Sequence, residues 1–445
     1  MRAKQSFPIG ILGQAVYDYA HIGNFRAYIV ADILKRYLKY KGFKVKHIMN
    51  ITDVDDKTIR NSRTQGVSLK EYTEKFTKAF FEDLGILNIA KADVFPKATE
   101  HIKEMIILVR KLIDKGIAYK SEDGSIYYNI SKFKNYGKFA HVDTTNLKTG
   151  ARIKQDQYEK DAVNDFALWK AYDKEDGNVF WETEIGKGRP GWHIECSAMS
   201  MKYLGNHFDI HTGGVDLIFP HHQNEIAQSE ASTGEKFVNY WVHNEHLLVE
   251  NKKMSKSLGN FYTLRDLLKK GYDPKAIRYL LMSTHYRQQL NFTLKGLDAA
   301  KNAVERLNNF IFNLNNIHGN KKNEKIEALI KDVKQKFEKK MDDDLNISEA
   351  LAMIFDFIRD INKEALSKKD AKLVKKVMFE FNTVLGVIEE QETAVSDKIQ
   401  DLINKREEAR KKKDFETADK IRDKLKSQGI LLEDTPNGVV WKKIS

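Results

Sequence analysis

A candidate metal-binding group lies in one stretch of the sequence, residues 190–230. This stretch holds Cys196, the only cysteine among 445 residues, and five of the thirteen histidines. Proline suits the first position of an α-helix, so a helix is predicted to start near Pro220. On that helix His221 and Glu225, four residues apart, project from the same face. With Cys196 they form a set of sulfur, nitrogen and oxygen ligands that suits zinc with one coordination position left open.

Each of these residues also has an ordinary structural explanation. A lone cysteine is most often a small buried apolar side chain, and a histidine and glutamate four apart are most often a surface pair. Residues 211–216 read HTGGVD, follow a short apolar run, and predict a loop at the end of a strand. Gly213 and Gly214 would let the backbone approach a ligand closely, and Asp216 could bond hydroxyl groups. This neighbouring loop favours a functional pocket.

Two further motifs flank this stretch, one on each side. Residues 17–24 read YDYAHIGN and precede an amphipathic run, and residues 252–260 read KKMSKSLGN. The first resembles the His-Ile-Gly-His element of class I aminoacyl-tRNA synthetases, with Asn24 in place of the last histidine. The second matches the Lys-Met-Ser-Lys-Ser element of the same class. With the strings GWHIECSAM and FPHHQNEIAQS between them, the motifs make residues 11–441 resemble the cysteinyl-tRNA synthetases.

The resemblance implies a two-step ligase that uses ATP with Mg²⁺ to form cysteinyl-adenylate and then transfers cysteine to the terminal ribose of tRNA(Cys). Catalytic roles are expected for His21, Asn24, Lys253 and Lys256. ATP is expected to contact His21, Gly23, Asn24, Gly213, Gly214, Asp216 and Lys256, and the amino acid to contact Thr52, Asp53, Trp192 and His211. The anticodon is expected to be read by Arg410, Asp419, Asp434 and Trp441.

The metal set departs from the family at one position. One zinc ion per chain, on Cys196 and its two partners, would bind the substrate thiol as a thiolate. The family has a further cysteine upstream of its Gly-x-Thr-Val-Tyr-Asp run, where this chain has Leu12, and Ala15 replaces the threonine. Three outcomes are open: zinc is retained with reduced affinity, His193 or His222 replaces the missing ligand, or metal and cysteine selectivity are both lost.

The elements predicted around these residues indicate a Rossmann-type α/β domain. A strand over residues 8–16, the loop at His21, a helix over residues 25–40 and a strand over residues 44–51 form its first half. Backbone N–H groups at that strand-to-helix turn favour phosphate. The acidic cluster within residues 50–57 is either a helix cap or part of the amino-acid pocket.

Capping and turn residues predict several boundaries further along the chain. Helix starts are predicted at Ser68, Thr99, Thr263, Asp273 and Asp414. Asn437-Gly438 between two apolar runs predicts a β-hairpin. Trp441 in this hairpin either seals a small core or stacks on an unpaired RNA base.

Changes in pattern divide the chain into six regions. They are a first Rossmann half (1–100), a connective insertion (101–190), a second Rossmann half with the zinc site (191–250), the Lys-Met-Ser-Lys-Ser loop and stem-contact region (251–296), a helical bundle (297–395) and an anticodon-binding end (396–445). The predicted fold is an α/β Rossmann-type catalytic domain with an inserted α+β subdomain, followed by an all-α bundle and a small C-terminal helical and β-hairpin domain.

Composition favours a globular protein with a polyanionic partner. The chain is 41% hydrophobic, enough to build cores, and its net charge is +12. One cysteine excludes an intramolecular disulfide framework. No apolar run approaches the roughly 20 residues that span a bilayer. We therefore expect a cytoplasmic monomer that binds tRNA and no membrane.

Two other functions compete with the tRNA ligase. A related ligase could pass activated cysteine to a small amine, although such an acceptor needs no anticodon reader. A paralogue that binds RNA without catalysis is favoured by Leu12 and Ala15, and opposed by the intact run over residues 253–257. Cysteine-dependent ATP–pyrophosphate exchange, followed by tRNA charging, distinguishes the three.

Overall fold

The computed structural model describes residues 6–11, 13, 15–142, 152–153, 164–389, 397–435 and 438–443. The chain forms two compact units, one made of residues 1–300 with 343–348 and the other of residues 301–342 with 349–445. Within the described residues, no helix combines the length and the apolar character that crossing a bilayer requires.

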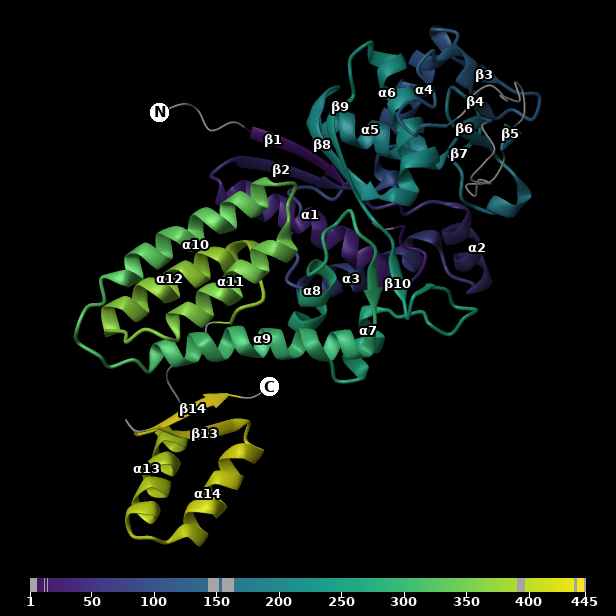
Figure 1. Ribbon diagram of the computed structural model, residues 1–445. Coiled ribbons are helices and arrows are strands. Elements are labelled where there is room, and N and C mark those ends of the chain that lie inside the picture. The colour runs from purple at the N-terminus through teal and green to yellow at the C-terminus, as the bar shows by residue number, and fades with distance from the viewer. Residues whose placement is uncertain are drawn as a thin grey trace. The chain divides into compact units, whose positions relative to one another are not determined.

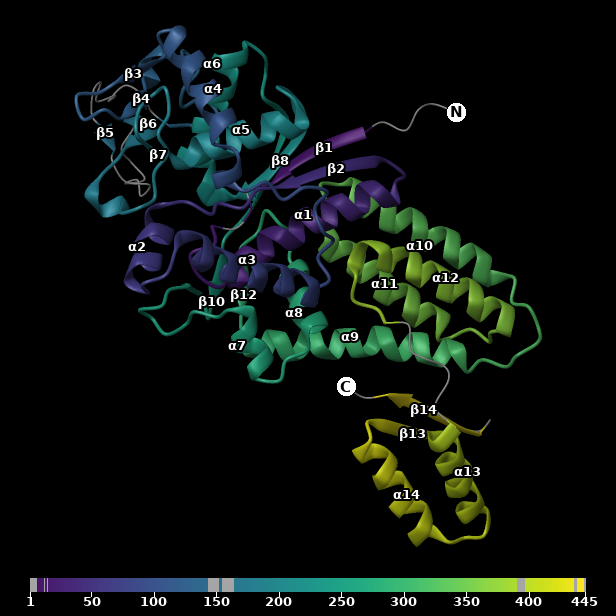
Figure 2. The same cartoon turned by 180° about the vertical axis from the view of Figure 1, so that it is seen from behind.

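A four-stranded parallel sheet forms the centre of the first unit, in the order β2-β1-β8-β9. The strands are β1 (Ser6–Ile11), β2 (Lys44–Met49), β8 (Phe208–Gly214) and β9 (Val238–Asn244). Helix α1 (Ile22–Tyr40) covers one face, and α5 (Trp192–Leu204) with α6 (Gln223–Thr233) covers the other (Figures 1 and 2). The two predicted halves of a Rossmann domain are therefore joined in one sheet, with Gly10 paired to His211.

Helix α1 begins where two side chains satisfy its first backbone groups. His21 is the N-cap and Asn24 the third helical residue, and each side chain accepts a hydrogen bond from the other's backbone N–H. The predicted helix is confirmed, with a start three residues earlier. The strand predicted over residues 8–16 is wrong in its second half, because β1 ends at Ile11. Beyond it, the Gly13 N–H bonds the Asn50 side chain instead of a neighbouring strand.

Three helices follow β2, namely α2 (Asp56–Thr64), α3 (Leu69–Ile86) and α4 (Ile102–Asp114). Ser68 caps α3 as predicted. The prediction that Thr99 starts a helix is wrong, because Thr99 lies within the 3₁₀ turn η1 (Ala98–Glu100). Its backbone N–H and hydroxyl both donate to the Asp53 carboxylate, at 2.9 and 2.6 Å, so α4 begins only at Ile102.

The insertion is a small mixed sheet with short helical turns. Its strands are β3 (Ala118–Lys120), β4 (Ile126–Tyr128), β5 (Arg152–Ile153), β6 (Asp165–Ala171) and β7 (Gly188–Pro190), with the turns η2 (Ile130–Lys132) and η3 (Lys174–Asp176). Tyr128, Phe166 and Trp169 are fully buried and pack with the apolar face of α4. The expected α+β subdomain is thereby confirmed.

The segment between β8 and α6 differs from its prediction. Two short turns, η4 (Val215–Leu217) and the π-helical η5 (Ile218–His222), precede α6. Pro220 is therefore not the first residue of the α-helix, since Phe219 has extended backbone and regular helix begins only at Gln223. His221 and Glu225 nevertheless remain one turn apart, because η5 continues into α6.

The remaining elements of the first unit are short. They are β10 (Leu247–Val249), β11 (Lys252–Lys253), α7 (Leu264–Lys269), α8 (Pro274–Met282) and β12 (Leu290–Phe292). Thr263 caps α7 and Asp273 caps α8, as predicted.

Helices α9 (Leu294–Asn315), α10 (Lys325–Asp342), α11 (Ile347–Ile361) and α12 (Lys368–Leu385) form the predicted bundle, with Phe337 and Phe381 in ring contact. Then come α13 (Asp397–Lys411), α14 (Phe415–Ser427) and the antiparallel strands β13 (Ile430–Thr435) and β14 (Gly438–Lys443). Asp414 caps α14, as predicted. The predicted turn residue Asn437 lies outside the described residues, but the two strands it joins are present.

Candidate functional site

A cavity of about 1740 Å³ lies at the carboxyl edge of the parallel sheet. Residues that follow β1 and residues at the ends of β8 and β9 line it, together with α2, the start of α5 and the loop after β11. Pockets for one small molecule typically measure roughly 300–1,000 Å³, so this cavity has room for more than one substrate. Ligands of open parallel sheets bind at this edge.

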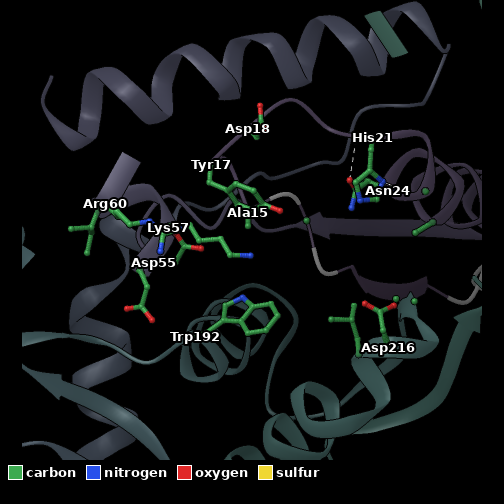
Figure 3. A pocket seen from close by; sticks show the side chains of 18 of the residues that line it. Ala15, Tyr17, Asp18, His21, Asn24, Asp55, Lys57, Arg60, Trp192 and Asp216 are labelled. Carbon is green, nitrogen blue, oxygen red and sulfur yellow. Dashed lines mark hydrogen bonds between the residues drawn. The ribbon is translucent and has the colours of Figure 1, made fainter. Parts of the chain in front are cut away.

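All seven residues predicted to bind ATP line this cavity. They are His21, Gly23, Asn24, Gly213, Gly214, Asp216 and Lys256, and the predicted residues Lys253 and Trp192 line it too. Figure 3 shows His21, Asn24 and Asp216 on one side of the cavity and Asp55, Lys57 and Arg60 on the other. The Trp192 indole lies between the two sides.

His21 is held in one tautomer by the helix cap. Burial lowers the pKa of His21, against the opposing charge of Asp216. The neutral ring accepts the Asn24 N–H at Nδ1, over 3.2 Å, so its own proton is on Nε2. The Nε2–H is therefore a donor beside the N-terminus of α1, where an anionic phosphate is favoured.

Lys253 ends β11, and Lys256 lies in the tight turn that follows this strand. Gly259 in this turn has a φ of +65°, a conformation that glycine adopts without strain. The Ser255 N–H bonds Asn260 Oδ1 at 2.9 Å and closes the turn. Lys253 is exposed on β11, whereas Lys256 pairs with Asp18. The two lysines thus reach the cavity from β11 and the turn after it rather than from the parallel sheet.

The three predicted metal ligands meet at one point. His221 Nε2 lies 3.3 Å from Cys196 Sγ and 3.3 Å from Glu225 Oε1, and all three residues are buried. Zinc at 2.0–2.3 Å from each ligand places tetrahedral ligands roughly 3.3–3.8 Å apart. Glu225 Oε1 is buried and accepts no hydrogen bond, as expected for an oxygen that serves a cation. The set therefore fits a zinc ion.

Neighbouring histidines orient these ligands. His193 Nδ1 lies 2.9 Å from His221 Nδ1, which leaves His221 Nε2 directed at Cys196 and Glu225. His211 contacts Glu225 Oε2 through Nε2 at 3.0 Å and the Gly10 carbonyl through Nδ1 at 3.0 Å. Such partners fix the orientation of a metal ligand. His193 thus lies on the far side of His221 from the three ligand atoms.

The charges of this site depend on each other. Although burial favours the neutral acid, His211 and His221 lower the pKa of Glu225 to about 2. Burial and the Glu225 charge raise the pKa of the Cys196 thiol. A cation bound between Cys196 and Glu225 would lower the pKa of the thiol again, because a metal ion holds its cysteine ligand as a thiolate. His222, whose Nε2 lies 3.9 Å from Glu225 Oε1, forms a second candidate group with His211 and Glu225.

Thr52 and Asp53 occupy different surroundings from those predicted. Both are buried, and neither lines the cavity. The Asp53 carboxylate faces Thr99. The Thr52 hydroxyl lies 3.4 Å from Asn50 Nδ2, which lies equally far from Cys196 Sγ. Asn50 is thus a neighbour of the metal set that the sequence analysis missed, although it begins the polar run at residues 50–57.

Of the two roles considered for the acidic cluster in residues 50–57, a helix cap or part of the amino-acid pocket, the structure shows the helix cap. Asp55 caps α2, with its Oδ1 accepting the Thr58 N–H. Asp56 binds Lys170 and Arg189 of the insertion. Lys57, which received no prediction of its own, lines the cavity. Leu12 lies outside the described residues, and Ala15 lines the cavity close to Thr52.

The four predicted anticodon contacts lie on separate elements of the C-terminal segment. Arg410 on α13 and Asp419 on α14 are exposed. In the hairpin, Asp434 pairs with Val439 and Trp441 with Leu432. The apolar core beneath the hairpin contains Ile403, Leu425, Ile430 and Leu432.

Comparison with known families covers nearly the whole chain. Residues 3–302 match the model of the tRNA synthetases class I (C) catalytic domain. Residues 336–389 match a DALR domain, and residues 392–441 match a cysteinyl-tRNA ligase anticodon binding domain.

Relatives and solved structures agree with this match. The cysteine–tRNA ligase of Protochlamydia amoebophila is 50% identical over 440 residues, 97% of this chain and 92% of the relative. That of Brachyspira hyodysenteriae is 51% identical over 444 residues, 97% of this chain and 94% of the relative.

The methionyl-tRNA synthetase of Mycobacterium tuberculosis, solved with methionyl-adenylate, has a TM-score of 0.63 at 14% identity, over 86% of this chain and 90% of that one. A putative arginyl-tRNA synthetase of Campylobacter jejuni has a TM-score of 0.59 at 14% identity, over 87% and 93%. The similarity to these two structures shows only a shared fold, whereas the family model and the relatives establish the family of this chain. The chain belongs to the cysteinyl-tRNA synthetases of class I.

Proposed function

We propose that this protein ligates L-cysteine to tRNA(Cys) with ATP. The observation that carries the proposal is the buried Cys196–His221–Glu225 set directly behind Trp192, which lines the same cavity as His21 and Lys256. The Trp192 and His221 ring centroids are 4.4 Å apart, so a side chain against Trp192 would reach the metal ligands. A thiol-selecting group and a nucleotide site thus share one cavity.

In the activation step, a carboxylate oxygen of cysteine attacks the α-phosphorus of ATP. The bond from the α-phosphorus to the bridging oxygen breaks, and pyrophosphate leaves with Mg²⁺. The His21 Nε2–H and the N-terminus of α1 would stabilise charge on the α-phosphate. Lys253 on β11 and Lys256 in the turn after it would bind the departing pyrophosphate.

In the transfer step, a hydroxyl of the terminal ribose attacks the carbonyl carbon of cysteinyl-adenylate, and AMP leaves. Gly213, Gly214 and Asp216 at the end of β8 would hold the adenosine part in place. Trp192 would form a wall for the cysteine side chain.

Zinc on Cys196, His221 and Glu225 would supply a soft Lewis acid that prefers a thiolate to a hydroxyl group. Asn50, His193 and His211 would keep these three ligands in place. Because sulfur ligation rejects serine, no separate editing site is required.

The net charge of +12 and the match to an anticodon binding domain support tRNA as the partner. Arg410, Asp419, Asp434 and Trp441 remain the residues proposed to read the anticodon. A cytoplasmic location and a monomeric state complete the proposal.

Cysteine-dependent ATP–pyrophosphate exchange followed by charging of tRNA(Cys) tests the function. Exchange and charging are both expected, with serine at least about 100-fold less effective than cysteine. Exchange without charging would indicate a small-acceptor ligase. Binding of tRNA without exchange would indicate the RNA-binding paralogue that Leu12 made worth considering.

A further inference from the structure

Lys57 is a cavity residue to which the two-step mechanism above gives no role. It is the second residue of α2, is half-buried, and lines the cavity. Figure 3 shows it on the side opposite His21, Asn24 and Asp216, where ATP would bind. Lys57 is therefore placed to meet a group other than the triphosphate.

The ammonium of Lys57 lies over an aromatic ring, and the charge of Asp55 is close enough to act on it. Its Nζ lies 4.8 Å from the centroid of the Tyr17 ring, and no ion pair joins it to a carboxylate of the described residues. Two other lysines of the cavity differ, since Lys170 is paired with Asp56 and Lys256 with Asp18. A half-buried cation that lies over a ring and forms no ion pair still has most of its hydrogen-bonding capacity available for a ligand.

The acids nearest to Lys57 already serve other partners. The Asp55 carboxylate caps α2 through Oδ1, and Asp56 binds both Lys170 and Arg189. Asp176 on the insertion side also binds Arg189, at 2.8 Å. The ion pairs of Asp56 and Asp176 offset part of the negative charge of this side, so an anionic ligand can approach Lys57.

The part of the cavity beyond Lys57 combines basic and aromatic side chains with the acids Asp123, Asp173 and Glu175. Arg60 and Arg63 of α2 line it, as do Ser125 and Tyr172 of the insertion. The side chain of Tyr172 is 37% exposed although it is a large ring. Exposed aromatic rings bind unpaired bases by stacking, while basic groups hold the phosphates between them.

We propose that Lys57 binds the phosphodiester that precedes the terminal ribose of the tRNA and so positions the attacking hydroxyl. The proposal rests on the function proposed above and assigns a residue to its second step. The ammonium would donate to the non-bridging oxygens of this phosphate, while the Tyr17 ring keeps the lysine stem directed into the cavity. Lys57 is then a positioning residue for transfer and contributes nothing to the formation of the adenylate.

Lys57→Met tests the proposal, because methionine keeps most of the stem over Tyr17 and removes only the charge. We expect transfer from preformed cysteinyl-adenylate, measured in a single turnover, to slow by about 10- to 100-fold, the worth of one hydrogen bond to a charged group. ATP–pyrophosphate exchange is expected to change by less than about twofold. Lys57→Arg is expected to restore transfer to within about tenfold of the original rate, because arginine also donates to phosphate.

Lys75→Met is the matched control. Lys75 also lies over a ring, with its Nζ 5.2 Å from the centroid of Phe76, but it is on α3 and does not line the cavity. Neither exchange nor transfer is expected to change in this variant.

A tRNA with an uncharged methylphosphonate at its last phosphodiester identifies the group that Lys57 contacts. This tRNA is expected to slow transfer by the unmodified enzyme as much as Lys57→Met does, and to cause little further loss in the variant. The proposal would be overturned if the modified tRNA and Lys57→Met slowed transfer independently, so that their effects multiplied. An equal loss of exchange and transfer in Lys57→Met would also overturn it. If the proposed function itself is wrong, the unmodified enzyme will show no cysteine-dependent exchange.

Discussion

Lys256 Nζ lies 2.6 Å from Asp18 Oδ2, so an ion pair joins the turn after β11 to the segment before α1. Asp18 raises the pKa of Lys256. The lysine side chain is 67% exposed and the aspartate 34%, and pairs with such exposure stabilise a protein by less than about 1 kcal/mol. The pair matters more for substrate binding, because Lys256 is the group proposed to bind pyrophosphate.

We expect Asp18→Asn to lower the KM for ATP by about two- to fivefold, because the carboxylate competes with the phosphates for the ammonium. The thermal midpoint is expected to change by about 1 °C or less. Exchange kinetics at low salt measure the effect, and 0.5 M NaCl should reduce it by screening. Asp401→Asn, which breaks the exposed pair of Asp401 with Lys405, is the control. A higher KM in Asp18→Asn would contradict this explanation.

Removal of one metal ligand is expected to release zinc. Glu225→Gln removes the charge that balances the cation, and we expect affinity for zinc to fall by at least about tenfold. Elemental analysis after gel filtration gives the zinc content, and cysteine-dependent exchange should fall in parallel. Glu235→Gln, at an exposed glutamate after α6, should keep both. Full zinc content in Glu225→Gln would mean that the metal does not depend on Glu225, which belongs to both candidate groups.

The residue at position 12 should set how firmly zinc is held. Leu12→Cys would supply the thiolate that the family has at this place, and a fourth ligand slows dissociation. We expect zinc loss to a chelator to slow by at least about tenfold and cysteine activation to increase. Leu12→Ser is the control of similar size to cysteine. If Leu12→Cys leaves both zinc loss and activation unchanged, position 12 does not face the metal.

His47 should make stability depend on pH. Burial and the Lys35 ammonium lower its pKa from the ordinary 6.5 to about 3. His47 is harder to protonate in the folded protein than in the unfolded chain. Its contribution to the free energy of unfolding is therefore complete above pH 6.5 and is lost as the pH falls toward 3. The loss is at most about 1.4 kcal/mol per pH unit.

Urea unfolding at pH 7 and pH 5 measures this dependence. We expect His47→Gln to unfold at lower urea than the original protein at pH 7 and to lose less stability between the two conditions. His318→Gln, at an exposed histidine, is expected to retain the original dependence. An unchanged dependence in His47→Gln would assign it to other histidines with a lowered pKa, such as His243.

Local patterns in the sequence predicted many of the helices and part of the metal site. The apolar spacing of residues 25–40 indicated α1, and short polar side chains marked the starts of α3, α7, α8 and α14. Spacing also indicated that His221 and Glu225 would share a face. These features follow from interactions within one or two helical turns, which a stretch of sequence contains in full.

Only the tertiary structure decided which distant residues meet. The pairing of β1 with β8 places Gly10 beside His211 and so helps to orient Glu225. Thr99, which as a polar residue could have capped a helix, is taken by Asp53 instead. Lys57 lines the cavity next to Asp55 and Asp56, whose carboxylates bind the Thr58 N–H and Arg189. Such contacts depend on strand order and on competition for partners across the whole fold. Neither can be predicted from a local pattern of residues.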